Sequence, residues 1–177
     1  MVTLHAAPTD ALTAPFLYEL RHLLNTAFAG DFTDEDWDST IGGVHVWLID
    51  SSEIISHAAL IERTLMCSGQ TLRVGYVEAV ATVATKRRKG HGARVMNRIN
   101  ELVRNRYRLG ALSSGTPAFY ATLGWERWHG PTFVNGARGR ERTPDDDGSI
   151  MILRTSRSPD LDLDGEIVCD WRRGDVW

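Results

Sequence analysis

Arg87-Arg-Lys-Gly-His-Gly92 is the stretch that decides the fold, because it joins two segments with different hydrophobic patterns. The residues before it, Tyr76 to Ala84, are rich in β-branched and apolar side chains, as expected of a strand. The residues after it, Ala93 to Tyr107, carry apolar side chains at helical spacing. Two glycines let the chain turn tightly, and the N–H groups at the start of the helix then point at one spot. The turn therefore predicts a binding site for an anionic group, with the layout of a pyrophosphate cradle.

On its own, this motif is weak evidence for a ligand. A helix N-terminus with two turn glycines and solvated charges at residues 86–89 would show the same pattern. The elements around the motif must therefore decide between the two interpretations.

The segments before the motif indicate two helices and an antiparallel meander. Apolar residues from Leu12 to Phe28 follow helical spacing, and Gly30 supplies a stop. Thr33-x-x-Asp36 resembles a capping box that opens a second, shorter helix, which Gly42-Gly43 would end. The expected strands are Val44–Leu48, Ile54–Met66 and Thr71–Ala84, with Ser68-Gly69-Gln70 as the hairpin loop between the last two. Glu78 lies in the apolar part of the third strand, where a buried carboxylate needs a reason.

The segments after the motif complete a mixed sheet. Leu109 to Leu112 is a short apolar run, expected to lie parallel to the strand before the motif because a crossover helix connects them. The other expected elements are a helix from Thr116 to Leu123 closed by Gly124, and strands at Trp125–Val134 and Ser149–Thr155 with a polar loop between them. Together the elements predict an α/β fold in a single domain, residues 1–177, with a mixed, largely antiparallel central sheet flanked by helices. The two parallel central strands should splay near Glu78 and the glycine turn, where ligands favour the carboxyl ends of the strands.

Composition fits one globular domain in the cytoplasm. The chain has 177 residues, 42% hydrophobic and 24% charged, which is enough for a substantial core. No apolar run approaches the roughly 20 residues of a membrane helix, and the N-terminus lacks the pattern of a secretory leader. Cys67 and Cys169 are too few for a disulfide framework, and the six histidines show no metal-ligand spacing. We therefore expect no metal, and we expect His45, His57 and His129 to pack or to hydrogen-bond.

The formal net charge of -3 hides an uneven distribution of charge. Basic residues crowd between Lys86 and Arg108, whereas acidic residues cluster at 31–38, 145–147 and 160–175. Such a separation suits two oppositely charged ligands. The net acidity, and the lack of aromatic residues among the basic ones, argue against nucleic acid as a partner.

Six short strings, together with the order of elements, point to a known family. They are Phe28-Ala-Gly-Asp-Phe-Thr33, Gly75-Tyr-Val-Glu78, Leu109-Gly-Ala-Leu-Ser-Ser114, Trp128-His-Gly-Pro131, Thr143-Pro-Asp-Asp-Asp147 and the C-terminal string Cys169-Asp-Trp...Gly-Asp-Val-Trp177. The order of elements, with the glycine turn and with Tyr120 near the Gly124-Trp125 pair, resembles the GNAT superfamily of acetyl-CoA-dependent N-acetyltransferases over nearly the whole chain. The six strings are similar to one branch, the aminoglycoside 2'-N-acetyltransferases.

The resemblance implies where the acetyl donor, acetyl-CoA, would bind. The glycine turn would hold the coenzyme A pyrophosphate through Arg87, Arg88, Lys89, Gly90, His91 and Gly92. The strand backbone at Val80, Ala81 and Thr82 would hydrogen-bond the pantetheine arm like an added strand. A backbone N–H near Val80 could then polarise the thioester carbonyl and stabilise its oxyanion.

Two residues would carry the chemistry by the same resemblance. Acetylation needs a free amine lone pair, and Glu78 would accept the proton of the ammonium, through water. The alternative for Glu78 is a strand carboxylate that faces solvent or pairs with a basic neighbour. Tyr120 would donate a proton to the departing coenzyme thiolate, and its alternative is an aromatic residue that packs into the core.

The resemblance also implies a site for a polycationic acceptor, whose ammonium and hydroxyl groups demand carboxylates and other acceptors. The expected substrate-binding residues are Asp31, Asp36, Glu78, Ala79, Ser113, Asp145, Asp146 and the terminal carboxylate of Trp177. For each acid the alternative is an exposed turn or helix start. The indole of Trp177 should be ordered and stack on the pocket rather than form a loose tail.

The implied activity is acetyl transfer from acetyl-CoA to the 2'-amino group of aminoglycosides, by direct attack in a ternary complex, which would confer resistance. A second hypothesis keeps the fold and changes the acceptor to another polyamine, an amino sugar or a protein lysine. A third is a non-catalytic acyl-CoA sensor or a nucleic-acid binder that uses the basic stripe. No membrane partner is expected, and a homodimer is compatible with the sequence, which carries no interface signature.

Overall fold

The computed structural model describes residues 1–177, and the chain divides into two compact units. The first unit comprises Met1–Ile61 and Val77–Ile99, and the second comprises Glu62–Tyr76 and Asn100–Trp177. Strands β3 (Glu53–Cys67) and β4 (Gln70–Thr82) and helix α3 (His91–Arg106) contribute to both units. None of the helices is both long enough and apolar enough to cross a membrane.

The first unit is built on an antiparallel sheet of β1 (Thr3–Pro8), β2 (Val44–Asp50) and the first half of β3. The strands predicted at Val44–Leu48 and Ile54–Met66 are confirmed as β2 and β3. Strand β1 was not predicted, because its side chains are almost all exposed and lack the alternation of a half-buried strand. It pairs with β2 alone and is an edge strand.

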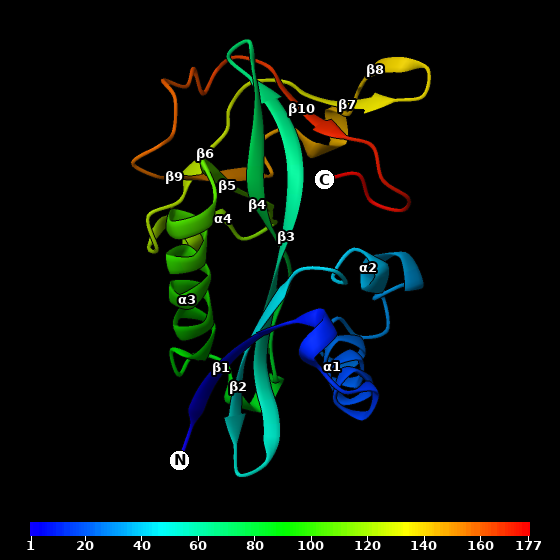
Figure 1. Ribbon diagram of the computed structural model, residues 1–177, viewed down its shortest axis with the longest axis vertical. Coiled ribbons are helices and arrows are strands. Elements are labelled where there is room, and N and C mark those ends of the chain that lie inside the picture. The colour runs from blue at the N-terminus through cyan, green and yellow to red at the C-terminus, as the bar shows by residue number, and fades with distance from the viewer. The chain divides into compact units, whose positions relative to one another are not determined.

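Two helices belong to the first unit, as predicted. Helix α1 (Ala14–Ala27) begins after Thr13, whose hydroxyl accepts from the Phe16 N–H, and it follows the short 3-10 turn η1 (Thr9–Ala11). Helix α2 (Asp34–Asp38) carries the predicted capping box at Thr33. It ends at Asp38, before the expected glycine stop, because hydroxyls of Ser39 and Thr40 take the last helical carbonyls. Figure 1 shows α1 and α2 on one side of β2 and β3, and the first turns of α3 on the other.

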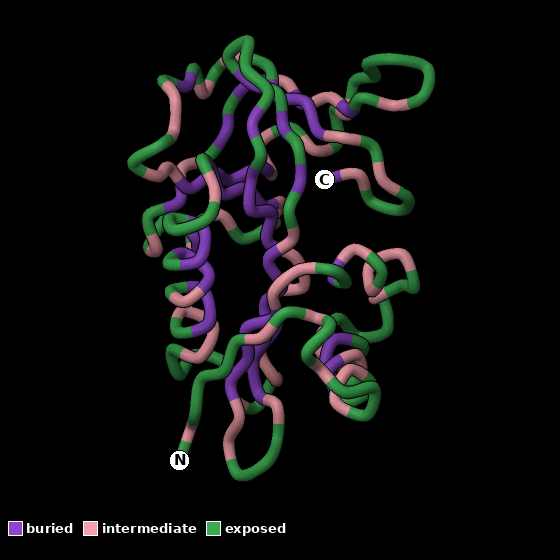
Figure 2. Tube along the Cα trace, in the orientation of Figure 1, coloured by how far each residue is buried: buried purple, intermediate pink, exposed green.

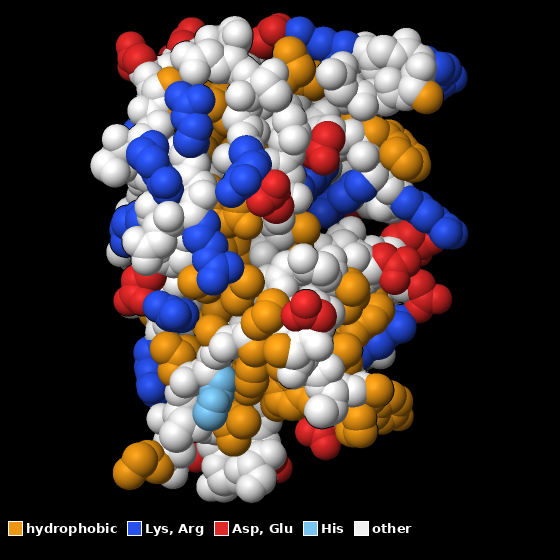
Figure 3. Space-filling model, viewed as in Figure 1, with side chains coloured by type: hydrophobic (Ala, Val, Ile, Leu, Met, Phe, Trp, Pro, Cys, Tyr) orange, Lys and Arg blue, Asp and Glu red, His pale blue; other side chains and the backbone are white.

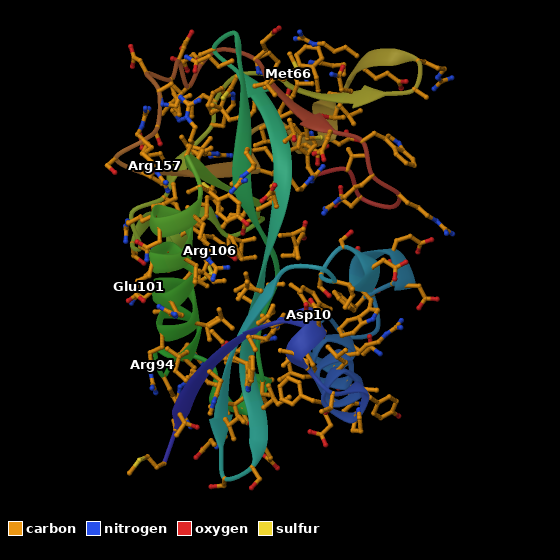
Figure 4. All side chains as sticks on the ribbon, in the orientation of Figure 1. Asp10, Met66, Arg94, Glu101, Arg106 and Arg157 are labelled. Atoms are coloured by element: carbon orange, nitrogen blue, oxygen red, sulfur yellow. The ribbon has the colours of Figure 1, made fainter.

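The glycine turn leads directly into α3. The helix begins at His91, two residues earlier than predicted, so His91 and Gly92 belong to its first turn. Gly90 has a φ of 79°, in the left-handed region that glycine adopts without strain. At the other end of α3, Arg157 donates to the carbonyls of Arg104 (3.1 Å) and Tyr107 (3.0 Å), where a cation complements the helix dipole. Arg157 and the helix residues Arg94, Glu101 and Arg106 are labelled in Figure 4.

The strands of the second unit run in the order β6-β9-β5-β4-β3-β10-β7-β8. The strands not yet introduced are β5 (Leu109–Ser113), β6 (Glu126–Arg127), β7 (Thr132–Gly136), β8 (Gly139–Arg142), β9 (Ile150–Arg154) and β10 (Ile167–Asp170). Strands β4 and β5 are parallel, as predicted, with Val74 opposite Leu109. Strands β7 and β10 form a second parallel pair, and the unit also contains α4 (Pro117–Ala121) and the 3-10 turn η3 (Pro144–Asp146). The predicted mixed, largely antiparallel sheet flanked by helices is confirmed.

Two predictions for the second unit are wrong in detail, and one strand lies in a segment for which no element was predicted. The single strand expected at Trp125–Val134 is two strands, β6 and β7, which pair with different neighbours. The break lies at Gly130, where a Cβ atom would come within 1.8 Å of the Gly165 carbonyl oxygen, so the backbones pass too closely for any side chain. The polar loop after Gly136 contains β8, and the C-terminal tail contains β10. Both strands have four residues, too few to show a period.

The core of the second unit includes aromatic residues from distant parts of the chain. Tyr76, Trp128 and Trp177 belong to one buried cluster, and the Trp128 Nε1–H donates to the Gly165 carbonyl at 2.8 Å. Figure 2 shows the chain buried at its C-terminus, beyond an exposed loop. The last residue is therefore part of the core.

Candidate functional site

The four basic residues of the glycine turn have two roles: Arg88 and Lys89 face solvent, whereas Lys86 and Arg87 make contacts that stabilise the turn. Lys86 forms an ion pair with Asp50 at 2.9 Å. Arg87 donates to the carbonyls of Thr82 (3.1 Å) and Ala27 (3.3 Å), so it ties the turn to β4 and to α1. Arg88 and Lys89 are exposed. The turn therefore offers these two charges, together with the N–H groups of the first turn of α3, which have no acceptors inside the helix.

His91 contributes more than its backbone to this turn. Its Nδ1 atom is buried and has no hydrogen-bond partner in the structure. A buried polar atom without a partner is uncommon and marks a place where a ligand or water can bind.

The segment expected to hold the pantetheine arm is fixed from one side by β3. The Ala79 carbonyl accepts from the Nδ1 atom of His57 at 3.0 Å, and the Ala81 carbonyl accepts from the Ser56 hydroxyl at 3.0 Å. Ala79 has a φ of 49°, so a left-handed residue interrupts the extended strand. Glu78, expected to be buried, is only half-buried. A half-buried carboxylate keeps access to water, which the proposed proton transfer needs.

The acidic residues of the first unit have different surroundings. Asp31 is exposed and precedes Phe32, which packs on the cluster that contains Ala79 and Ala81. The Asp36 carboxylate accepts from the Thr33 N–H (2.8 Å) and the Thr33 hydroxyl (2.9 Å), so it serves the capping box of α2. This contact favours the structural interpretation of Asp36. Figure 3 shows acidic side chains gathered over α2 and basic side chains gathered over α3.

The second unit brings together the predicted acceptor residues from three distant segments. The Ser113 hydroxyl donates to the Ser149 hydroxyl at 3.0 Å, and the Ser149 hydroxyl donates to the Asp146 carbonyl at 2.7 Å. The Asp146 N–H donates to the Thr143 carbonyl at 3.0 Å, and the Thr143 hydroxyl accepts from the Trp177 Nε1–H at 3.0 Å. One hydrogen-bonded chain therefore connects Ser113, Asp146 and Trp177.

Three consecutive aspartates in this region differ in role. Asp147 binds Arg142 through both carboxylate oxygens (2.8 and 2.5 Å), which holds the pKa of Asp147 well below its usual range. Burial raises the pKa of the Asp146 carboxyl, and the negative charge of Asp175 adds to this rise. Asp145 is exposed. A hydrogen bond with the Thr143 side chain opposes the rise in the pKa of Asp146, and the neighbouring charges that act on the Asp146 carboxylate are all negative, as expected of a group that receives a cationic ligand.

The C-terminal residue is held at both its ring and its backbone. Trp177 is only 2% exposed. Its N–H donates to Asp175 Oδ1 at 3.1 Å, and its backbone oxygen accepts from Arg172 Nη2 at 3.1 Å. Trp177 is therefore buried rather than loose in this structure, and its backbone oxygen has a cationic neighbour in Arg172.

Tyr120 lies in α4 and is almost fully buried. Its ring makes edge contacts with Phe119 and Trp125, at centroid distances of 5.0 and 6.3 Å. Burial raises the pKa of the Tyr120 phenol to about 12, and a hydrogen bond with Ser114 opposes this rise. The phenol is therefore protonated across the physiological range and has a proton to donate.

Residues 10–128 match the family described as Acetyltransferase (GNAT) domain. The chain belongs to the GNAT acetyltransferase family. The predicted superfamily and enzyme class, an acetyltransferase, are thereby confirmed.

Relatives of this acetyltransferase span a range of similarity. It is 41% identical over 161 residues to an aminoglycoside 2'-N-acetyltransferase of Mycolicibacterium fortuitum, covering 89% of this chain and 83% of that one. A GNAT family N-acetyltransferase of Escherichia coli, solved in complex with CoA, has a TM-score of 0.66 at 14% identity, over 95% of this chain and 89% of that one. A GCN5-related N-acetyltransferase of Kribbella flavida has a TM-score of 0.58 at 19% identity, and the match covers 73% of this chain but 35% of that longer one.

Sequence reasoning missed two features of this acetyltransferase. One is a cavity of about 440 Å³ beside α1, whose lining includes His22, Ile54 and Val83. The other is the pair of contacts from Ser56 and His57 to the carbonyls of β4. Serine and histidine within a β-rich run are a usable signal, because a buried polar side chain must find a partner. The partners of Ser56 and His57, two carbonyls of β4, are known only from the structure. No group of three or more His, Cys, Asp or Glu side chains is arranged to hold a metal ion.

Proposed function

We propose that this GNAT acetyltransferase transfers the acetyl group of acetyl-CoA to the 2'-amino group of aminoglycosides. The observation that best supports an aminoglycoside as the acceptor is the hydrogen-bonded chain that connects Ser113, Asp146 and Trp177 in the second unit. This chain runs through the backbone of Asp146, whose half-buried carboxylate has a raised pKa, and it ends at a hydroxyl and at a buried indole, groups suited to a rigid, hydroxylated cation. The 41% identical relative, an aminoglycoside 2'-N-acetyltransferase, supports this acceptor.

The first unit supplies the groups for the coenzyme. In this proposal the pyrophosphate lies on the first-turn N–H groups of α3, with Arg88 and Lys89 as counter-charges. The pantetheine arm runs along the β4 backbone at Val80, Ala81 and Thr82. Arg87 holds the turn in shape through its bonds to Thr82 and Ala27. The CoA complex of the Escherichia coli family member, which shares this fold, supports CoA as the donor.

The reaction is a direct attack of the amine nitrogen on the thioester carbon. Glu78, through water, takes a proton from the ammonium and frees its lone pair. The new C–N bond converts the carbonyl to a tetrahedral oxyanion, which the Val80 N–H stabilises. Collapse breaks the C–S bond, and the sulfur leaves as a thiolate that receives a hydrogen bond, and then a proton, from Tyr120. The second proton that the nitrogen loses as the amide forms passes through water to restore the Tyr120 phenol, and the proton on Glu78 is released to solvent. The products are an acetamide and free CoA.

Asp31 and Asp36 contribute to acceptor binding in different ways in this proposal. Asp31 is exposed and available to a second ammonium group, while Asp36 is engaged by Thr33 and contributes through the capping box that holds the loop. Acetylation removes one positive charge from the drug. Because aminoglycosides bind an anionic target through several such charges, the product binds it less tightly, and this is the basis of resistance.

Mass spectrometry of an aminoglycoside incubated with the protein and acetyl-CoA tests the proposal. The expected result is the mass gain of one acetyl group on drugs with a 2'-amino group, and none on matched drugs with a 2'-hydroxyl group. Glu78→Gln should abolish most of the gain. No gain on any 2'-amino drug would overturn the proposed acceptor, and thiol release with polyamines, amino sugars or lysine peptides would then identify another.

A further inference from the structure

A line of buried hydrogen bonds crosses the first unit and ends on the strand expected to hold the thioester. The Thr9 hydroxyl lies 2.9 Å from His45 Nε2, His45 Nδ1 lies 3.0 Å from His57 Nε2, and His57 Nδ1 lies 3.0 Å from the Ala79 carbonyl oxygen. Both histidines are fully buried. Thr9 belongs to the short turn between β1 and α1, which Asp10 marks in Figure 4.

The hydrogen atoms in this line can be assigned in one direction only. The Ala79 carbonyl can only accept, so His57 donates from Nδ1, and its neutral ring must then accept at Nε2. His45 therefore donates from Nδ1 and accepts at Nε2, where the Thr9 hydroxyl donates. The Thr9 oxygen in turn accepts from the Gly42 N–H at 3.0 Å. Every polar atom of the two rings is satisfied when both are neutral.

Burial keeps the two rings in this neutral form. It lowers the pKa of His45 to about 4, and the pKa of His57 to about 3 with a further contribution from His45. With His45 donating from Nδ1, a proton added at His57 Nε2 would face the His45 N–H at a distance of 3.0 Å. The line is therefore a fixed brace throughout the neutral range rather than a pH-dependent switch.

The brace acts at a residue that needs support. The φ of 49° at Ala79 lies in the left-handed region, which is unfavourable for a residue with a Cβ atom. Such conformations persist where the surroundings hold them. The Ala79 methyl group packs against the buried cluster of Leu23, Leu24 and Ala81, and the Ala79 carbonyl is held by His57.

The Ala79 carbonyl and the Val80 N–H belong to the same peptide group. Because that group is planar and trans, its C=O and N–H point in opposite directions, so a bond that fixes the carbonyl also fixes the direction of the N–H. A carbonyl that accepts a hydrogen bond also polarises its own amide, which strengthens the N–H as a donor.

We propose that His57, aligned by its hydrogen bond with His45, is a positioning residue that aims and polarises the Val80 N–H toward the thioester oxygen of acetyl-CoA. The inference rests on the proposed function for the donor, but it does not depend on which amine is the acceptor. His57 touches neither substrate, and it acts through one peptide group.

Two variants of His57 separate its two contacts. His57→Asn keeps a donor at the place of Nδ1 and thus the bond to Ala79, whereas His57→Gln keeps a polar end at the place of Nε2 and loses that bond. Removal of an oxyanion donor lowers kcat by about 100- to 1,000-fold, and a misdirected donor should cost part of this. We expect kcat to fall by roughly 10- to 100-fold in His57→Gln and by less than about 5-fold in His57→Asn, with CoA affinity unchanged in both.

The decisive measurement uses the donor alone. Acetyl-CoA with a ¹³C-labelled carbonyl is bound to the protein without an acceptor, and the infrared stretch of the carbonyl is recorded. Binding to the unmodified protein and to His57→Asn should lower its frequency, and binding to His57→Gln should lower it less. Equal frequencies in all three, with each variant folded by circular dichroism and bound to acetyl-CoA by calorimetry, would overturn the inference.

His45→Asn gives a second test if His57→Gln does not fold. It keeps the donor to His57 and loses the acceptor for Thr9, so the stretch should stay within the range of the unmodified protein. A loss of the shift in His45→Asn as large as that expected for His57→Gln would mean that the line acts through general stability, against the inference. A dependence of the shift on His57 without acetylation of any aminoglycoside would overturn only the proposed acceptor. Failure of the unmodified protein to bind acetyl-CoA would overturn both proposals.

Discussion

Replacement of Asp146 by asparagine should weaken acceptor binding without destabilising the protein. The side chain keeps its size, and its backbone contacts to Thr143 and Ser149 are made by main-chain atoms that the substitution leaves in place. Only the negative charge is lost. Because that charge is half-buried and has no basic partner among the causes of its raised pKa, its expected partner is an ammonium group of the acceptor.

The size of the effect follows from the kind of bond that is lost. A hydrogen bond to a charged group contributes about 1.5–3 kcal/mol. Since about 1.4 kcal/mol is a factor of ten, kcat/KM for the aminoglycoside should fall roughly 10- to 150-fold, mainly through KM. The affinity for CoA should stay the same, because the residues expected to bind CoA belong to the other unit.

The stability of the same variant should move in the opposite direction. A raised folded-state pKa means that the ionised Asp146 is less favourable in the folded chain than in the unfolded one. This unfavourable contribution is absent at low pH, where the carboxyl is protonated in both states, and is fully present above the folded-state pKa. At neutral pH the amide removes it, so the melting temperature should be unchanged or slightly higher.

Steady-state kinetics and thermal unfolding of three variants check this reasoning. Asp145→Asn changes an exposed neighbour and should alter kcat/KM by less than about 5-fold. Asp147→Asn breaks the two-point contact with Arg142 and should lower the melting temperature. An Asp146→Asn protein with an unchanged KM for every 2'-amino drug, or with a clearly lower melting temperature, would refute the assignment of Asp146.

Three further predictions concern single positions. One glycine added after Trp177 keeps the buried ring but moves the terminal carboxylate. The KM for the acceptor should rise by about 10-fold, while calorimetry shows unchanged CoA binding. An unchanged KM would mean that the carboxylate does not belong to the acceptor site. Tyr120→Phe keeps the edge contact with Trp125 and should lower kcat by at least about 100-fold. In the unmodified protein the pKa of the Tyr120 phenol is about 12, so ionisation of this phenol should not lower kcat up to about pH 10. Gly130→Ala meets the Gly165 carbonyl at 1.8 Å and should cost about 3 kcal/mol, or roughly 6–12 °C in melting temperature, while Gly115→Ala, with no atom within 4 Å of its Cβ, should be neutral.

Local signals were sufficient for the long elements of the fold and not for the short ones. Helices α1 and α3 and strands β2, β3 and β4 each cover enough residues for a period to be visible, so the sequence located them within a few residues. Strands β8 and β10 have four residues each, and their pairing with β7 depends on residues far along the chain. The edge strand β1 has an almost fully exposed pattern and therefore carried no signal.

The same distinction applies to the candidate site. The glycine turn is contiguous, so its ligand class could be predicted from its letters. The three aspartates at 145–147 are also contiguous, but the role of each depends on a partner elsewhere, such as Arg142 for Asp147. Asp36 shows the converse case, because the capping-box pattern was visible in the sequence and its contact with Thr33 now favours a structural role. The brace at Ala79 was invisible because it needs two histidines from two strands to meet.

The identity of residue 79 explains why a brace is needed at all. Glycine adopts a positive φ without strain, and a glycine there would relieve the left-handed conformation. It would also let the peptide group rotate more freely and would remove the methyl group that packs against the buried cluster of Leu23, Leu24 and Ala81. Alanine accepts the strain, and packing on one side and His57 on the other hold it in place. A strained alanine held from two sides fixes the direction of the next N–H more tightly than an unstrained glycine could. Stabilisation of an oxyanion depends on donors that are aimed before the charge develops, so this rigidity is what the proposed role of Val80 requires.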